Sequence, residues 1–216
     1  MLNMDMNALV GIQMNESEWQ PSPREGVWRK PLAREDAESG HATSIVRFEA
    51  GSRFTEHGHP LGEEVFVLDG VFSDHTGDFD KGSYFRNPPG FDHAPFSIGG
   101  CTIFVKLHQF LPGDEQRVCH NYLKPDEIAQ WQSIGDYESL RLHQFESEKV
   151  RLIRSAAESA SLEIDQKGAE VFLVEGGVEY LGLSYNAGAW LRIPKASTGS
   201  ITLASHSLLW AKMGHL

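Results

Sequence analysis

The chain has 216 residues, of which 40% are hydrophobic and 23% are charged, a composition typical of globular proteins that bury a core. Its formal net charge of −11 repels phosphate backbones, so we do not expect direct binding to nucleic acid. No apolar run is long enough to span a bilayer, and the first residues lack the basic and apolar regions of a signal peptide, so no membrane association is expected. Two cysteines, Cys101 and Cys119, do not make a disulfide framework, and we expect a cytoplasmic protein.

Short apolar stretches separated by glycine and proline predict an all-β protein. Stretches with the length and residue types of strands lie at 43–48, 65–68, 102–107, 171–174 and 207–211. Many short strands with glycine-rich turns favour a β-barrel or a β-sandwich. One short helix is predicted at 124–131, because its proline and acidic residues suit the first turn of a helix.

The sequence repeats itself at an offset of 106 residues. Glu64–Gly70 (EVFVLDG) aligns with Glu170–Gly176 (EVFLVEG), and the same offset without gaps pairs Gly82 with Gly188 and Lys106 with Lys212. Repetition over this length predicts two copies of one β module, at 1–122 and 123–216, joined through the helical piece. The alternative is one continuous β-sandwich.

A group of histidines and one glutamate in the first copy predicts a metal site. His57 and His59 are two apart, so on a strand both side chains would point to the same face. Glu63 follows after a short turn, and His93 would come from a neighbouring strand, fixed by the Pro88–Gly90 turn. Three imidazoles and a carboxylate suit one divalent transition-metal ion, with zinc as the first expectation and iron, manganese or nickel as alternatives.

The spacing of these residues resembles the two motifs of the cupin superfamily. The first motif, G-x5-H-x-H-x3-E-x6-G, is matched from Gly51 to Gly70. The second, G-x5-P-x-G-x2-H-x3-N, is matched from Gly82 to His93 and departs only at Ser97, a position that is structural in the family. The resemblance implies two tandem cupin barrels of the double-stranded β-helix (jelly-roll) type, with few short helices.

Several residues near the motifs have alternative interpretations. Glu64 could replace Glu63 as the ligand, but adjacent strand residues face opposite ways, so only one of them should reach the ion. Cys101 is expected to pack as a small buried hydrophobe. We expect His75, His108 and His120 to be solvated or satisfied histidines, and Phe66, Phe85, Phe91, Phe96 and Phe104 to form core, with one or two of them lining the metal cavity.

The second copy lacks the predicted ligands. At the 106-residue offset His57 becomes Glu163, His59 becomes Asp165, Glu63 becomes Ala169 and His93 becomes Gly199. We therefore expect a degenerate copy without metal, retained for packing or as a partner surface.

A closer resemblance covers Trp19–Lys106, through segments such as Gly62–Asp74 and Gly100–Lys106. These segments are similar to the cupin domain of ChrR-type anti-sigma factors. In that family a zinc-binding helical domain binds a sigma factor, and the cupin takes part in the response to oxidants. The sequence has no Cys-x2-Cys motif for such a zinc domain, so a sigma factor as partner is implied by the resemblance alone.

Two functional classes follow from these observations. The first is a metal-binding bicupin that regulates or senses, by responding to oxidants or binding a small molecule. The alternative is a non-haem metal-dependent dioxygenase-like enzyme acting on a small oxygenated substrate, which would need open positions on the ion. Because edge strands need covering, and by resemblance to cupin dimers, we expect a homodimer.

Overall fold

Antiparallel strand pairing dominates the computed structural model, which describes residues 1–36, 39–164, 166–197 and 199–216. The all-β class predicted from the sequence is confirmed. Backbone contacts divide the chain into two units, one made of Met1–Met4 with Glu18–Glu127 and the other of Asp5–Ser17 with Ile128–Leu216. Within the described residues, none of the helices has the length and the hydropathy to cross a membrane.

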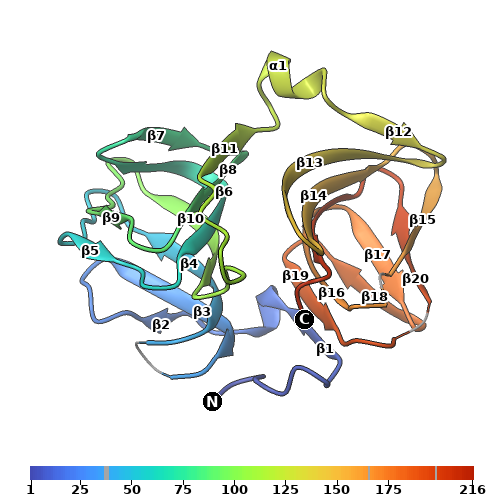
Figure 1. The fold of residues 1–216 in the computed structure, drawn as a ribbon, viewed down its shortest axis with the longest axis horizontal. Coiled ribbons are helices and arrows are strands. Elements are labelled where there is room, and N and C mark those ends of the chain that lie inside the picture. Colours follow the sequence, from blue (N-terminus) through green and yellow to red (C-terminus); the bar gives the residue numbers. More distant parts are fainter. Residues whose placement is uncertain (37–38, 165, 198) are drawn as a thin grey trace. The chain divides into compact units, whose positions relative to one another are not determined.

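The first unit contains an eight-stranded sheet and the two-stranded β5–β9 pair (Figure 1). The main path of the large sheet runs β11-β8-β6-β10-β4-β3-β2, and β7 pairs with the second half of β6. Its core includes Val65, Val67, Phe72 and Ile103. The elements, with α1 at the boundary of the unit, are β2 (Gln20–Pro21), β3 (Val27–Arg34), β4 (Ala42–Phe48), β5 (His57–Gly58), β6 (Glu63–Asp74), β7 (Gly77–Asp80), β8 (Ser83–Asn87), β9 (Asp92–His93), β10 (Cys101–Leu107), β11 (Val118–Asn121) and α1 (Pro125–Ile128).

The second unit contains a seven-stranded and a four-stranded sheet, ordered β1-β19-β16-β21-β14-β13-β12 and β15-β20-β17-β18. Apolar side chains such as Leu173, Leu191, Ile201 and Leu203 pack together in its core. The elements are β1 (Val10–Gln13), η1 (Met14–Glu16), β12 (Gln132–Ile134), β13 (Tyr137–Phe145), β14 (Glu148–Ser155), β15 (Ser159–Glu163), β16 (Ala169–Glu175), β17 (Gly177–Tyr180), β18 (Leu183–Asn186), β19 (Ala189–Ile193), β20 (Ser200–Ala204) and β21 (Leu208–Met213).

The 106-residue repeat reappears in the strand pairing of the two units. Phe66 lies opposite Phe104 in the first unit, and Phe172 lies opposite Trp210 in the second, a shift of 106 on both strands. The irregularity between Thr102 and Ile103 on β10 also recurs at the corresponding place, where β16 shifts register against β21. A shared register with a shared bulge indicates that the sequence repeat corresponds to a repeat of structure.

The two large sheets differ in the origin of one end strand, which follows the first copy in the sequence in one unit and comes from the N-terminal arm in the other. In the first unit β11 pairs with β8, whereas in the second the N-terminal strand β1 pairs with β19, with Ile12 opposite Trp190 (Figure 1). The expected division at residues 122 and 123 kept the N-terminal arm with the first copy, but Asp5–Ser17 belongs to the second unit. A four-residue strand carries no local signal that identifies its partner, because pairing depends on the free edge that it meets.

Candidate metal centre

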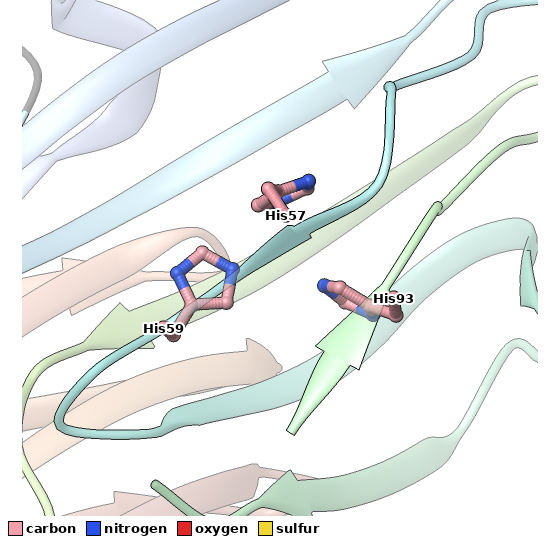
Figure 2. A group of neighbouring side chains, drawn as sticks. All are labelled: His57, His59 and His93. Atoms are coloured by element: carbon pink, nitrogen blue, oxygen red, sulfur yellow. The ribbon is translucent and has the colours of Figure 1, made fainter. Parts of the chain in front are cut away.

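The structure brings the four predicted ligand residues together in the first unit. His57 on β5 lies directly opposite His93 on β9, and His59 follows in the turn that leads to Glu63, the first residue of β6. Gly90, with φ of +85°, adopts the left-handed conformation in the turn before β9, which a non-glycine residue rarely adopts. Figure 2 shows the imidazole rings of His57, His59 and His93 turned toward one another.

The donor atoms of these residues converge on a common centre. One ring nitrogen from each of the three histidines lies within 4.8 Å of the other two. Glu63 Oε2 is 3.4 Å from His59 Nε2 and 3.4 Å from His93 Nε2. His93 Nε2 is buried and has no hydrogen-bond partner among the described residues, which is uncommon for a buried polar atom. A nitrogen in this position, among two imidazoles and a carboxylate, fits a bound divalent ion.

Hydrogen bonds at Nδ1 orient two of the three imidazoles. His57 Nδ1 lies 2.8 Å from the carbonyl oxygen of Thr55, and His93 Nδ1 lies 3.2 Å from Asp74 Oδ2. Because a carbonyl and a carboxylate can only accept, the neutral rings carry their proton on Nδ1. Each Nε2 lone pair is then available to a metal, the arrangement that protein metal sites use to fix the tautomer.

Asp74, which the sequence analysis did not predict, extends this network away from the histidines. Its Oδ1 accepts hydrogen bonds from the backbone nitrogen of Thr76 at 2.7 Å and from Thr76 Oγ1 at 2.6 Å. Arg117 in turn donates to Thr76 Oγ1 at 2.7 Å. The Asp74 side chain is fully buried, so its carboxylate is held in place by these bonds beneath His93.

Burial and neighbouring charges shift the pKa values of this group in different directions. Burial lowers the pKa of His59 to about 3, helped by the nearby His57 and His93, so its ring is neutral at any physiological pH. Burial raises the pKa of Glu63 to about 7, with Asp74 adding to the effect. Burial opposes the charging of His93, but Asp74 and Glu63 outweigh it and raise the pKa of that imidazole. Burial also opposes ionisation of Asp74, yet its hydrogen bonds with His93 and Thr76 lower the pKa to about 2.

A cavity of about 230 Å³ opens beside the four residues, and all four line it. Nine of its described lining residues are apolar, among them Phe48, Phe54 and Phe72. An apolar lining next to a cluster of polar donors is the usual character of a small-molecule site. The cavity phenylalanines differ from the prediction, because none of the five named from the sequence lines it. Phe66, for example, stacks on Tyr122, and Phe85 packs in the core.

Other polar residues near the motifs make contacts of their own in the structure. Glu64 accepts a hydrogen bond from the Tyr84 hydroxyl at 2.6 Å, away from the histidine cluster. His75 is exposed and stacks on Phe91, and His120 bonds to Glu127 at 2.9 Å. Cys101 is buried, and burial raises the pKa of its thiol to about 11, which agrees with packing rather than reactivity. Ser97 donates to the Val71 carbonyl oxygen at 2.6 Å, a structural role.

The corresponding positions of the second unit offer no comparable set among the described residues. Ala169 is fully buried, Glu163 is exposed, and Gly199 has no side chain. Asp165 lies outside the described residues. Apolar side chains such as Val178, Ile201 and Leu209 pack together in the core of this unit.

The two neighbouring glutamates provide a matched pair of variants. Glu63→Gln is expected to weaken metal binding at least about 10-fold, because it removes the one anionic donor of the cluster. Glu64→Gln should leave metal affinity within about 2-fold of wild type, since that carboxylate bonds to Tyr84 instead. Competition with a chromophoric chelator measures both, and an equal loss in the two variants would refute this assignment.

Comparison with known proteins agrees with this architecture. Residues 7–111 match the family model described as the ChrR cupin-like domain. The matched residues include all four predicted ligand residues. No curated protein matches the chain significantly in sequence. Among solved structures, a candidate dioxygenase from Nostoc punctiforme is 14% identical with a TM-score of 0.72, covering 97% of this chain and 84% of that chain.

Two further solved structures are similar in fold to this chain. Protein Ylba from E. coli is 12% identical with a TM-score of 0.69, covering 96% of this chain and 91% of that chain. A point mutant of Bacillus subtilis oxalate decarboxylase is 10% identical with a TM-score of 0.64, covering 94% of this chain and 76% of that chain. At these identities the likeness concerns the fold alone.

Proposed function

We propose that the first unit is a metal-binding cupin in which His57, His59, Glu63 and His93 hold one divalent transition-metal ion. The observation that carries this proposal is the buried Nε2 of His93, which has no hydrogen-bond partner among the described residues and lies among the other donors. Three neutral nitrogens and one carboxylate oxygen suit zinc, and also iron, manganese or nickel.

The ion and the cavity together would bind a small molecule, and the role would be regulatory or sensing. When bound, the ion supplies a Lewis acid or, for iron and manganese, a redox centre. Four protein donors leave up to two positions for a ligand on a six-coordinate ion and none on a tetrahedral one. The match of residues 7–111 to the ChrR cupin-like domain supports sensing, because the resemblance to ChrR-type anti-sigma factors implies a cupin that takes part in the response to oxidants.

A dioxygenase-like enzyme is the second candidate, and the open cavity favours it. A catalytic centre needs room for substrate beside the ion, and the apolar wall with Phe48, Phe54 and Phe72 would exclude water from that space. The likeness in fold to a candidate dioxygenase from Nostoc punctiforme is consistent with this alternative.

We further propose that the second unit is a metal-free copy of the same barrel, so that the chain is a bicupin. The shared strand order and register support this interpretation. An apolar core, together with the replacement of all four ligand residues in the sequence of this copy, would leave it a packing or partner-binding role.

The proposal is tested by elemental analysis of untagged protein, followed by oxygen uptake after reconstitution with Fe(II). About one ion per chain is expected, and a chain that binds no divalent metal after reconstitution would refute the metal site. Zinc with no oxygen uptake on small diketones would favour the sensing role, whereas substrate-dependent uptake would favour the enzyme.

Metal affinity is expected to fall as the pH drops from 8 to 6. In the metal-free protein Glu63, with a pKa of about 7, and His93, with a raised pKa, take up protons over this range, and an ion must displace them. His59, with a pKa of about 3, takes up none. Each displaced proton weakens apparent affinity by up to about 10-fold per pH unit below the pKa. Chelator competition at several pH values measures the slope, and a flat profile would contradict these assignments.

A further inference from the structure

Two arginines share the cavity with the proposed metal ligands. Arg29 and Arg34 both lie on β3, are half-buried, and line the same cavity as His57, His59, Glu63 and His93. Arg34 Nε also donates to the carbonyl oxygen of Asp36 at 3.1 Å, which helps to hold the side chain in position. A guanidinium remains charged at all physiological pH values, so two permanent cations line this cavity.

A β-bulge places the two arginines on the same face of β3. Side chains alternate along a regular strand, so residues five apart would point to opposite faces. The register shifts between Pro31 and Ala33, with the result that Arg29 lies opposite Val46 and Arg34 opposite Ala42. Val46 and Ala42 both line the cavity, and cross-strand partners share a face. The bulge therefore turns Arg34 to the cavity side, where Arg29 already lies.

Other cations of the same two strands lie on the opposite face. Lys30 Nζ is 5.0 Å from the centre of the Trp19 ring, and the Arg47 guanidinium is 4.6 Å from it. Neither Lys30 nor Arg47 lines the cavity. The four cations of β3 and β4 thus lie on two faces: Lys30 and Arg47 pack against Trp19, and the two arginines of β3 line the cavity.

The arginines and the proposed metal ligands lie at different ends of an apolar passage. Arg34, Ala42, Leu107 and Glu63 form one cross-strand row, from β3 through β4 and β10 to β6. Three strand spacings separate β3 from β6, roughly 14 Å along the curved sheet. The residues between them in the row are apolar. A molecule that fills the cavity would meet metal donors at one end and guanidinium groups at the other.

We propose that the ligand of this cavity is a small organic dianion, with one carboxylate directed to the ion and a second carboxylate bound by Arg29 and Arg34. This inference rests on the metal-binding function proposed above. The planar guanidinium matches a carboxylate with two parallel hydrogen bonds, and charge-assisted bonds of this kind strengthen inside an apolar cavity. A short aliphatic chain between the two carboxylates would lie against Val46, Val105 and Leu107.

The proposal is tested by titrating the Co(II)-loaded full chain with unbranched dicarboxylates from succinate to pimelate. Binding is measured by calorimetry and by changes in the visible spectrum of cobalt. Each diacid is compared with its own monomethyl ester, which keeps the chain but loses one charge. At least one diacid should bind roughly 10- to 100-fold more tightly than its ester and change the cobalt spectrum. Arg29→Gln with Arg34→Gln should reduce this preference to about 1.

Matched variants separate this role from general charge and from folding. Arg47→Gln removes a cation from the outer face of β4 and should keep the preference. Arg29→Lys with Arg34→Lys keeps both charges, so part of the preference should survive even where the glutamine variant is unstable. Equal affinity for diacid and ester in metal-loaded protein, or a preference that persists without the two arginines, would overturn the dianion while the metal site stands. A chain that binds no cobalt would overturn both.

Discussion

Replacing His93 with alanine is expected to reduce the metal content from about one ion per chain to less than about a tenth. His93 supplies the most deeply buried donor of the cluster, and its Nε2 is the atom that has no hydrogen-bond partner among the described residues. Removing a coordinating imidazole costs more affinity than removing the residue behind it, for which 10- to 100-fold is typical. Inductively coupled plasma analysis of dialysed protein measures the content.

Two controls distinguish loss of a ligand from loss of the fold. His120→Ala removes an imidazole that bonds to Glu127 outside the cluster, and Glu163→Ala alters the second unit at the position that corresponds to His57. Both should keep the full metal content. Added metal should also raise the Tm of wild type and of both controls but not that of His93→Ala, since only a bound ion stabilises the folded state. A His93→Ala variant that retained its metal would remove His93 from the site.

Local spacing was sufficient to predict the four clustered residues. The His57-x-His59 pair, the glutamate four residues later and the proline-glycine turn before His93 are short-range features, and short strands bring such residues together in the way the motifs imply. Glu63 was separated from Glu64 by strand alternation alone, and the structure has Glu64 bonded to Tyr84.

The features that the sequence did not reveal depend on pairing between distant segments. Arg34 faces the cavity because β3 has an extra residue relative to β4, and a bulge cannot be read from one strand without its partner. The cavity phenylalanines depend in the same way on which strand faces which. Asp74 had a usable signal, since it lies two residues after Phe72 on β6 and should share its face, but identifying it required knowing where that strand ends relative to β9.

Asp74→Asn is expected to weaken metal binding about 10- to 100-fold, and by more than Asp74→Ala does. In wild type both carboxylate oxygens accept, Oδ1 from the two Thr76 donors and Oδ2 from His93 Nδ1. An asparagine amide has only one oxygen. The backbone N–H and the hydroxyl of Thr76 both donate to that oxygen, so they would compete for it with the single Nδ1–H of His93. The amide nitrogen would then face Nδ1 and donate to it.

The reversed hydrogen bond would move the proton of His93 from Nδ1 to Nε2. A protonated Nε2 cannot coordinate, so the asparagine would hold the ring in the wrong tautomer, whereas alanine leaves the tautomer free. Metal affinity from chelator competition and the ring nitrogen shifts from ¹⁵N NMR of the metal-free variants measure the two effects separately. Asp74→Asn protein with wild-type affinity and an Nδ1–H tautomer would show that Asp74 does not position His93. The Asp74 carboxylate thus stabilises the coordinating tautomer of His93 without itself contacting the ion.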